Sequence, residues 1–302
     1  MSALTATNVD TQFDVVETPN QKARKRKAFG FRIILISAAT FTIAALVTLL
    51  WTILKDGWSY LSWHLITDMP SRKPEISGLN SALWGTVWVI CITALFAFPI
   101  GTASAIYLEE YGPKNRLTRL LQLNISNLAG VPSVVYGLLG LGIFAEMLSL
   151  GRSVITGGLT MALLILPIII IASQEAIRAV PPSLREAGYG LGATKWQVTW
   201  HHVLPSALPG ILTGTILAVS RAIGEAAPLL VAGASGFLLF KPDGLDSSYT
   251  TLPIQIFNWT SRPQEEFRQL AAAGITVLLA VLLVMNSIAI IVRQRASRKL
   301  RG

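Results

Sequence analysis

The sequence predicts an all-α integral membrane protein with six transmembrane helices. Of its 302 residues, 52% are hydrophobic and 14% are charged, whereas about a quarter of the residues of a soluble domain carry a charge. Charge-free apolar runs recur along the chain, and basic residues gather at their ends. Such runs can cross the hydrocarbon core of a bilayer as helices. We therefore expect one transmembrane domain at residues 33–292, between cytoplasmic tails at residues 1–32 and 293–302.

The net charge of +9 fits a membrane surface better than a nucleic acid. The basic residues lie beside apolar runs, where anionic lipid headgroups and the positive-inside rule place them. We therefore expect membrane lipid as a partner and no nucleic acid. The single cysteine, Cys91, has no partner in this chain for a disulfide.

The first apolar run, residues 33–54, holds no charged residue and follows a polar tail and a basic block. A cleaved signal peptide is the alternative, but this core exceeds the usual ~7–15 residues and no small-x-small cleavage site follows it. Two later runs contain an internal proline, Pro99 and Pro167, which membrane helices tolerate because their neighbours satisfy the freed carbonyls. The predicted spans are residues 33–54, 80–108, 120–145, 154–173, 208–240 and 270–292.

Six spans place both termini on one side of the membrane, and the basic residues identify that side. Seventeen Lys and Arg residues lie on the side of the termini and seven on the other, with Arg221 inside a span. By the positive-inside rule, both termini are cytoplasmic. The stretch 178–205 is then cytoplasmic too, whereas the loops 55–78 and 241–268 face outward.

The cytoplasmic stretch predicts two short helices joined by a glycine elbow. Pro181 and Pro182 end the preceding helix, and Ser183 with Glu186 three residues later suits a capping box. Residues 193–203 can form a second helix that ends at a Leu-Pro pair. The sharp turn between the two helices is permitted by Gly188, Gly190 and Gly192. Taken alone, this pattern fits an amphipathic connector on the membrane surface equally well.

The stretch contains Glu186-Ala187-Gly188, then Gly192, and ends in Leu204-Pro205. This pattern resembles the EAA motif of permease subunits of ATP-binding-cassette importers, in which the motif forms coupling helices that dock into a groove on a separate ATPase subunit. Gly188 and His202 depart from the pattern, since alanine and an aliphatic residue are usual there. The resemblance implies a type I ABC importer permease fold (MetI-like). It also implies ATPase-coupling roles for Glu186, Ala187, Gly188, Gly192, Leu204 and Pro205.

No G-x-x-x-x-G-K-[ST] phosphate-binding loop occurs in the sequence. We therefore expect no enzymatic activity and no cofactor in this chain, with ATP and Mg²⁺ on the partner ATPase. The three histidines fall on both sides of the membrane, so we expect no metal site.

Two charged residues lie inside the fifth predicted span. Arg221 is 13 residues past Leu208, which places it near the middle of the membrane, and Glu225 is four residues further along the same helix face. A charge at that depth costs about 2.5–3.5 kcal/mol on insertion scales, so it should face a partner or water. A structural ion pair is one interpretation. The other is a substrate path in which the guanidinium meets a phosphate-like oxyanion and Glu225 orients it or releases the anion.

The segment SRAIGEAAPLL resembles the RAIGETAPL signature of the PstA family, the A-type permeases of phosphate-specific ABC importers, with Ala226 in place of the usual threonine. The segment GVPSVVYGLLGLGIF, residues 130–144, resembles a segment of both kinds of phosphate permease. This resemblance implies a transport role for Arg221 and, less directly, for Glu225. It also implies a second homologous permease subunit in a heterodimer, two ATPase subunits and a periplasmic phosphate-binding protein.

The function expected from these features is import of inorganic phosphate across the bacterial inner membrane by alternating access. One alternative is an importer of the same type for another oxyanion, such as sulfate or molybdate. Another is an ion-driven secondary transporter, and a third is a scaffold that reports phosphate status to a sensor kinase. Pro132, Ser133 and Tyr136 can serve transport or only helix packing and a proline kink.

Overall fold

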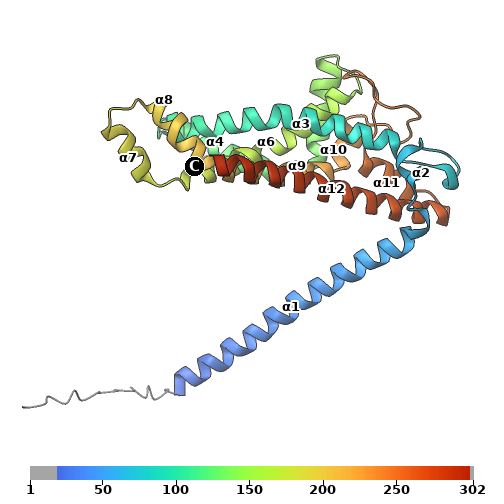
Figure 1. The fold of residues 1–302 in the computed structure, drawn as a ribbon, viewed down its shortest axis with the longest axis horizontal. Coiled ribbons are helices and arrows are strands. Elements are labelled where there is room, and N and C mark those ends of the chain that lie inside the picture. The colour runs from blue at the N-terminus through green and yellow to red at the C-terminus, as the bar shows by residue number, and fades with distance from the viewer. Residues whose placement is uncertain (1–18, 300–302) are drawn as a thin grey trace, which may run out of the picture. The chain divides into compact units, whose positions relative to one another are not determined.

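The computed structural model describes residues 19–299, which form helices and loops without a strand (Figure 1). Within this part of the chain, five helices are long and apolar enough to cross a membrane, or six if one bent pair counts as a single span. The all-α fold class with six spans is therefore confirmed. The chain divides into two units, residues 1–52 and 53–302.

The α-helices are α1 (Pro19–Gly57), α2 (Trp63–Thr67), α3 (Asn80–Ile106), α4 (Arg116–Ala129), α5 (Ser133–Leu139), α6 (Val154–Arg178), α7 (Pro182–Gly190), α8 (Lys195–Val198), α9 (Leu204–Ile223), α10 (Ala227–Val231), α11 (Leu252–Thr260) and α12 (Glu265–Lys299). Three π-helical segments, in which the turns are wider, extend or link these helices: η3 (Tyr107–Tyr111), η4 (Gly140–Met147) and η5 (Thr199–Val203). Two short 3₁₀ turns are η1 (Trp58–Tyr60) and η2 (Pro74–Ile76).

In the first unit, α1 begins at Pro19, so residues 19–32, predicted to belong to a tail, are helical. Proline suits the first turn of a helix, and the lysines, arginines and alanines that follow it are good helix formers. The predicted tail at residues 1–18 lies outside the described residues. At the other terminus, α12 continues to Lys299, so the predicted basic tail from residue 293 is also helical as far as it is described.

The second unit is built around α6, which packs against α3 and α9. Small residues allow these helices to approach closely. A Cβ built on Gly214 of α9 would lie 2.3 Å from the Cβ of Ala172, and one built on Gly210 would lie 2.7 Å from the Cβ of Ala176. Packing of this kind is typical of membrane helices, whose association relies on close van der Waals contact.

The third predicted span is broken. Helix α4 ends at Ala129, and the helix formed by α5 and η4 leaves it at an angle of 106°. Pro132 is the N-cap of α5, where its ring and its missing N–H do not disturb a helix interior. The predicted span over residues 120–145 is therefore a bent pair of helices, and the bend lies at Pro132, where a proline kink was one of the two interpretations.

The fifth predicted span is also discontinuous. Helix α9 ends at Ile223, three residues separate it from the short helix α10, and irregular backbone follows from residue 232. The prediction of a helix up to residue 240 was wrong because apolar composition alone does not require helical backbone.

The segment after α10 is tied to the ends of α3 and α6. The backbone N–H groups of Val154 and Ile155 donate to carbonyls of this segment, and Leu252 donates to the Thr86 hydroxyl at 2.9 Å. Tyr249 is fully buried, and burial raises the pKa of its hydroxyl, so it stays protonated. Helix α11 is itself largely buried, packing against α12 and α3, so the predicted outer loop 241–268 contains a packed helix.

Candidate functional site: a docking module and a mid-membrane arginine

Residues 182–205, which hold the predicted ATPase-coupling helices and are named the docking module for that prediction, project from one end of the second unit, opposite the end that carries α2 and α11 (Figure 1). Its first helix, α7, starts with Pro182 at its first position and has no side-chain cap. The predicted capping box at Ser183 is therefore wrong. A capping box does form one helix later, where Gln197 N–H donates to Thr194 Oγ1 and Thr194 N–H donates to Gln197 Oε1.

The predicted glycine elbow is present, and its glycines have different roles. Gly192 has a φ of +80°, a left-handed conformation that residues with a Cβ rarely adopt. Gly188 is buried, and a Cβ built on it would lie 2.8 Å from Val198 Cγ2. Gly190 has open space around it and no left-handed backbone, so the turn does not depend on it.

The second short helix of the module does not end at the Leu-Pro pair. Helix α8 continues through η5 into α9 as one helix from Lys195 to Ile223. A proline inside a helix leaves a carbonyl without its donor, and the wider turn of a π-helix can accommodate such an interruption. Leu204 and Pro205 are therefore the first residues of α9, and they lie inside one continuous helix from Lys195 to Ile223.

The residues predicted to couple to an ATPase divide between the surface and the interior. Glu186, Ala187 and Gly192 are exposed, Gly188 is buried, and Leu204 packs against the core. Sequence reasoning missed the apolar side chains beside them. Leu191 is 89% exposed, and the rings of Trp196 and Trp200 stack at 5.4 Å on the surface. The four-residue spacing of the tryptophans was the signal that could have found them.

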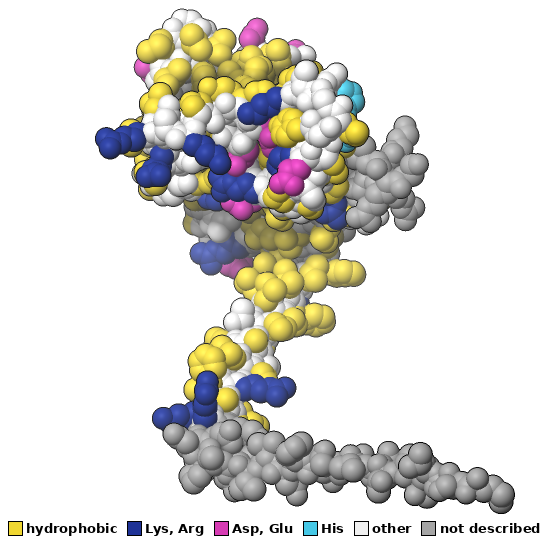
Figure 2. Space-filling model, turned by 90° about the vertical axis from the view of Figure 1, so that its left-hand side faces the viewer, with side chains coloured by type: hydrophobic (Ala, Val, Ile, Leu, Met, Phe, Trp, Pro, Cys, Tyr) yellow, Lys and Arg dark blue, Asp and Glu magenta, His cyan; other side chains and the backbone are white. Residues whose placement is uncertain are grey.

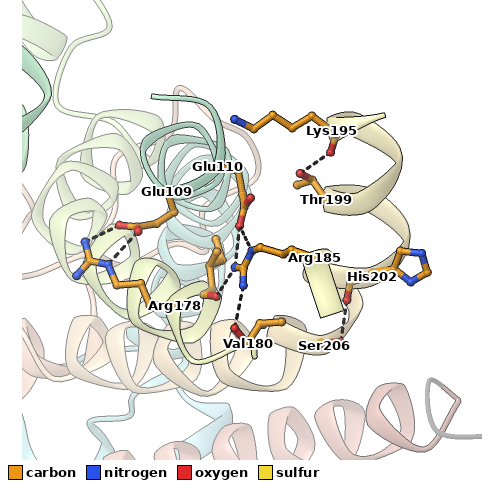
Figure 3. Close-up of polar contacts among 10 residues, drawn as sticks. Glu109, Glu110, Arg178, Val180, Arg185, Lys195, Thr199, His202 and Ser206 are labelled. Carbon is orange, nitrogen blue, oxygen red and sulfur yellow. Dashed lines mark hydrogen bonds and ion pairs between the residues drawn. The ribbon is translucent and has the colours of Figure 1, made fainter. Parts of the chain in front are cut away.

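One ion pair fastens the module to the rest of the unit, and a second joins α6 to η3 (Figure 3). Arg185 Nη2 lies 2.8 Å from Glu110 Oε1, and Arg178 Nε lies 2.9 Å from Glu109 Oε2. Both glutamates belong to η3, which extends α3. Lys195 lies over the ring of Tyr111, also in η3, with its Nζ 5.3 Å from the ring centroid. The sequence shows the charges but not these partners, because each pair joins positions that lie far apart along the chain.

The same end of the unit carries many charged side chains, and Figure 2 shows basic and acidic groups gathered there. Three further basic residues, Lys114, Arg116 and Arg119, line a pocket beside Glu109 with a volume of about 700 Å³. Among the described residues, no three His, Cys, Asp or Glu side chains lie together as a metal site would require.

Arg221 lies in the last turn of α9, and its Nε is 3.5 Å from Glu225 Oε1. The predicted proximity of these two residues is confirmed, but the predicted shared helix face is wrong, because α9 ends at Ile223 and Glu225 lies beyond it. The contact is long, and the Arg221 side chain is 52% exposed, so most of its N–H donors remain accessible within the described chain. The neighbouring Ser220 is instead turned toward α12, where its hydroxyl donates to Asn286 Oδ1.

The depth of Arg221 follows from the antiparallel packing of α9 on α6. Gly210 faces Ala176 and Gly214 faces Ala172. Continuing this register residue by residue places Arg221 opposite position 165, the middle of α6. Helix α9 ends at Ile223, so Arg221 lies next to the break in this helix, at half the depth of α6.

The two family-signature segments, far apart in sequence, pack against each other. A Cβ built on Gly137 of α5 would lie 2.6 Å from the carbonyl oxygen of Pro228 in α10. Tyr136 is buried, and its hydroxyl donates to the Leu128 carbonyl across the α4–α5 bend at 2.8 Å. Tyr136 thus stabilises the bend. Pro132 is the N-cap of the helix that follows, and Ser133, its first residue, is half-buried.

Residues 97–302 match the family described as binding-protein-dependent transport system inner membrane component. The phosphate transport system permease protein PstA 1 of Mycobacterium tuberculosis is 33% identical over 261 residues, covering 85% of this chain and 84% of that protein. PstA of Yersinia pestis is 32% identical, covering 91% and 93%. The probable ABC transporter permease protein YqgI of Bacillus subtilis is 31% identical, covering 82% and 88%.

Solved structures agree on the fold. A chain of a bacterial alginate ABC transporter matches with a TM-score of 0.62 and 16% identity, covering 91% of this chain and 97% of that one. A chain of the inward-facing MetNI methionine ABC transporter matches with a TM-score of 0.55 and 18% identity, covering 72% and 94%. The chain has the fold of ABC importer permeases and belongs to the family of binding-protein-dependent transport system inner membrane components, in its PstA branch.

Proposed function

We propose that this chain is the transmembrane permease subunit of an ATP-driven importer that moves inorganic phosphate across the bacterial inner membrane. Relatives that match most of the chain and are named as phosphate transport permeases support this substrate. The observation that carries the proposal is Arg221, an exposed guanidinium at half-depth beside a helix break. A planar guanidinium binds phosphate oxygens through paired hydrogen bonds, and interrupted helices at mid-membrane are typical of transport sites.

The permease acts within a larger complex. It pairs with a second homologous permease, two ATPase subunits dock on the modules of the two permeases, and a periplasmic phosphate-binding protein delivers the anion to the outer loops. The ATPase subunits hold ATP and Mg²⁺. The exposed apolar patch of Leu191, Trp196 and Trp200 supports the docking role, because exposed clusters of this kind mark protein interfaces. Both termini lie in the cytoplasm.

Transport proceeds by alternating access. Closure of the ATPase subunits draws the docking modules together and rocks the bundles open to the outside, where phosphate enters from the binding protein. The anion then meets Arg221, whose side chain is available to it. Glu225, an acceptor-only carboxylate within 3.5 Å of Arg221, orients the guanidinium and competes with phosphate for it, which favours release.

Uptake of radiolabelled phosphate and sulfate by cells tests the proposal. We expect Arg221→Ala to lower phosphate uptake about tenfold or more, and Arg221→Lys to lower it less, because an ammonium keeps the charge but loses the planar fork. Arg24→Ala, which removes an exposed arginine of α1, should leave uptake unchanged. Full phosphate uptake in Arg221→Ala contradicts the path role.

The same assay separates the alternatives. Wild-type uptake of sulfate or molybdate in preference to phosphate indicates an importer of the same type for another oxyanion, which Arg221 would serve equally well. Uptake that collapses with the proton gradient and persists without an ATPase indicates an ion-driven secondary transporter.

A further inference from the structure

Arg185 of the docking module joins three parts of the second unit (Figure 3). Its Nε and Nη2 donate to Glu110 Oε1 at 3.1 and 2.8 Å. Its Nη1 donates to the Val180 carbonyl at 2.8 Å, and its Nη2 also donates to the Ile177 carbonyl at 3.0 Å. One guanidinium of α7 therefore holds the end of α6 and the π-helical extension of α3.

The contact between Arg185 and Glu110 favours a rigid link. The Glu110 side chain is 7% exposed and the Arg185 side chain 21% exposed, so the pair is largely removed from water. A buried charge requires a partner, and the planar fork of arginine fixes the orientation of both groups. Ile177 lies in the last turn of α6 and Val180 lies two residues beyond its end, in a region where a helix leaves carbonyls available to outside donors.

A parallel contact binds α3 to α6 directly. Glu109 accepts from Arg178 and from Gln174, both on α6, at 2.9 Å each. The ends of α3 and α6 are thereby joined to each other, and Arg185 joins α7 to both. Because α3 and α6 also share the most extensive helix packing in the unit, they are set to move as one body.

Arg185 and Glu186 are consecutive residues of α7 with opposite exposures. Glu186 is exposed, whereas Arg185 points into the unit and reaches Glu110. A displacement of α7 at Glu186 therefore acts directly on the neighbouring Arg185, which is bound to Glu110. Elsewhere the module meets η3 through Lys195 of α8, whose Nζ lies over the Tyr111 ring.

We propose that Arg185 is a positioning residue that passes the movement of the docking module to the α3–α6 pair through Glu110. The proposal rests on the proposed function, since it assigns a route for force inside an ATP-driven permease. It predicts that loss of the pair uncouples ATP hydrolysis from transport and leaves the complex assembled.

The test uses the complete importer in proteoliposomes, with phosphate uptake and ATP hydrolysis measured on the same sample. We expect Arg185→Met and Glu110→Gln to co-purify with the ATPase at wild-type levels, to hydrolyse ATP, and to import about tenfold less phosphate per ATP, or less still. Arg185→Lys should retain a larger share, because an ammonium can still reach Glu110. Arg24→Met is the control, because Arg24 is exposed on α1, and it should keep the wild-type ratio.

Two results would overturn the proposal. One is an unchanged ratio of phosphate imported to ATP hydrolysed in both Arg185→Met and Glu110→Gln. The other is loss of ATPase co-purification in both variants, because the pair would then build the docking surface and not transmit its movement. Either result leaves the proposed function intact if the wild-type complex imports phosphate, whereas a wild-type complex that imports none contradicts the proposed function itself.

Discussion

Single residues decide how closely the helices of the second unit approach. Gly214 is the clearest case, because its Cα faces Ala172 of α6 and any side chain there would overlap it. The same antiparallel register that brings these two residues together places Arg221 at half-depth. The position of the charged site therefore depends on a glycine two turns away in the same helix.

Gly214→Ala should destabilise the protein, because the added methyl carbon would lie 2.3 Å from the Cβ of Ala172. Overpacking of this kind costs about 1–3 kcal/mol. We expect a lower Tm for the purified protein in detergent. Gly142→Ala is the control, since no atom lies within 4 Å of the added Cβ, and its Tm should equal or exceed that of the wild type. Equal melting of both variants would contradict the tight α6–α9 contact.

At the scale of elements, hydropathy predicted the long helices well and the interrupted ones poorly. The first, second, fourth and sixth predicted spans correspond to α1, α3, α6 and α12, because long apolar runs have few alternatives to helix in a membrane. Hydropathy did not locate the breaks in the third and fifth spans. Pro132 is compatible with a continuous kinked helix or a sharp bend, and contacts from distant segments, such as Gly137 with Pro228, accompany the bend.

The docking module shows the same division. Its glycine elbow and the closeness of Arg221 to Glu225 followed from spacing along the chain, which short-range geometry governs. The partners of Arg178 and Arg185 did not, because Glu109 and Glu110 belong to another helix. A single sequence gives no information about which of several distant charges will meet.

The module also carries a prediction about assembly. Glu186 is exposed on α7 of the docking module, so Glu186→Lys reverses a charge at the proposed ATPase interface without disturbing the core. We expect about tenfold less ATPase to co-purify with the variant, since reversing a charge breaks the charge complementarity between two docked surfaces. The measurement is ATPase recovered per permease from tagged membranes, with Arg24→Glu, an exposed position of α1, as the charge-reversal control. Wild-type recovery in Glu186→Lys would argue against docking at this surface.

For the whole molecule, the distribution of basic residues predicts the orientation in the membrane. The second unit separates its ends clearly, with the docking module at one and α2 and α11 at the other (Figure 1). Lys114 lies in the pocket near the docking module, and Arg72 lies in the loop between α2 and α3.

Single cysteines test this orientation. After Cys91→Ser removes the native thiol, a membrane-impermeant maleimide added to intact spheroplasts should label Arg72→Cys and should label Lys114→Cys only after the membrane is opened. The reason is that positively charged loops are retained in the cytoplasm. Labelling of Lys114→Cys in intact spheroplasts would reverse the topology.

The bend between α4 and α5 has a consequence for biogenesis. Helix α4 has 14 residues with a polar side, and the α5–η4 helix that follows it is made of parts with 7 and 8 residues. A helix needs about 20 apolar residues to partition into a bilayer unaided. Both pieces pack against α6, which is synthesised after them. We therefore expect the nascent third span to wait at the translocon until α6 emerges, so that the two enter the lipid together.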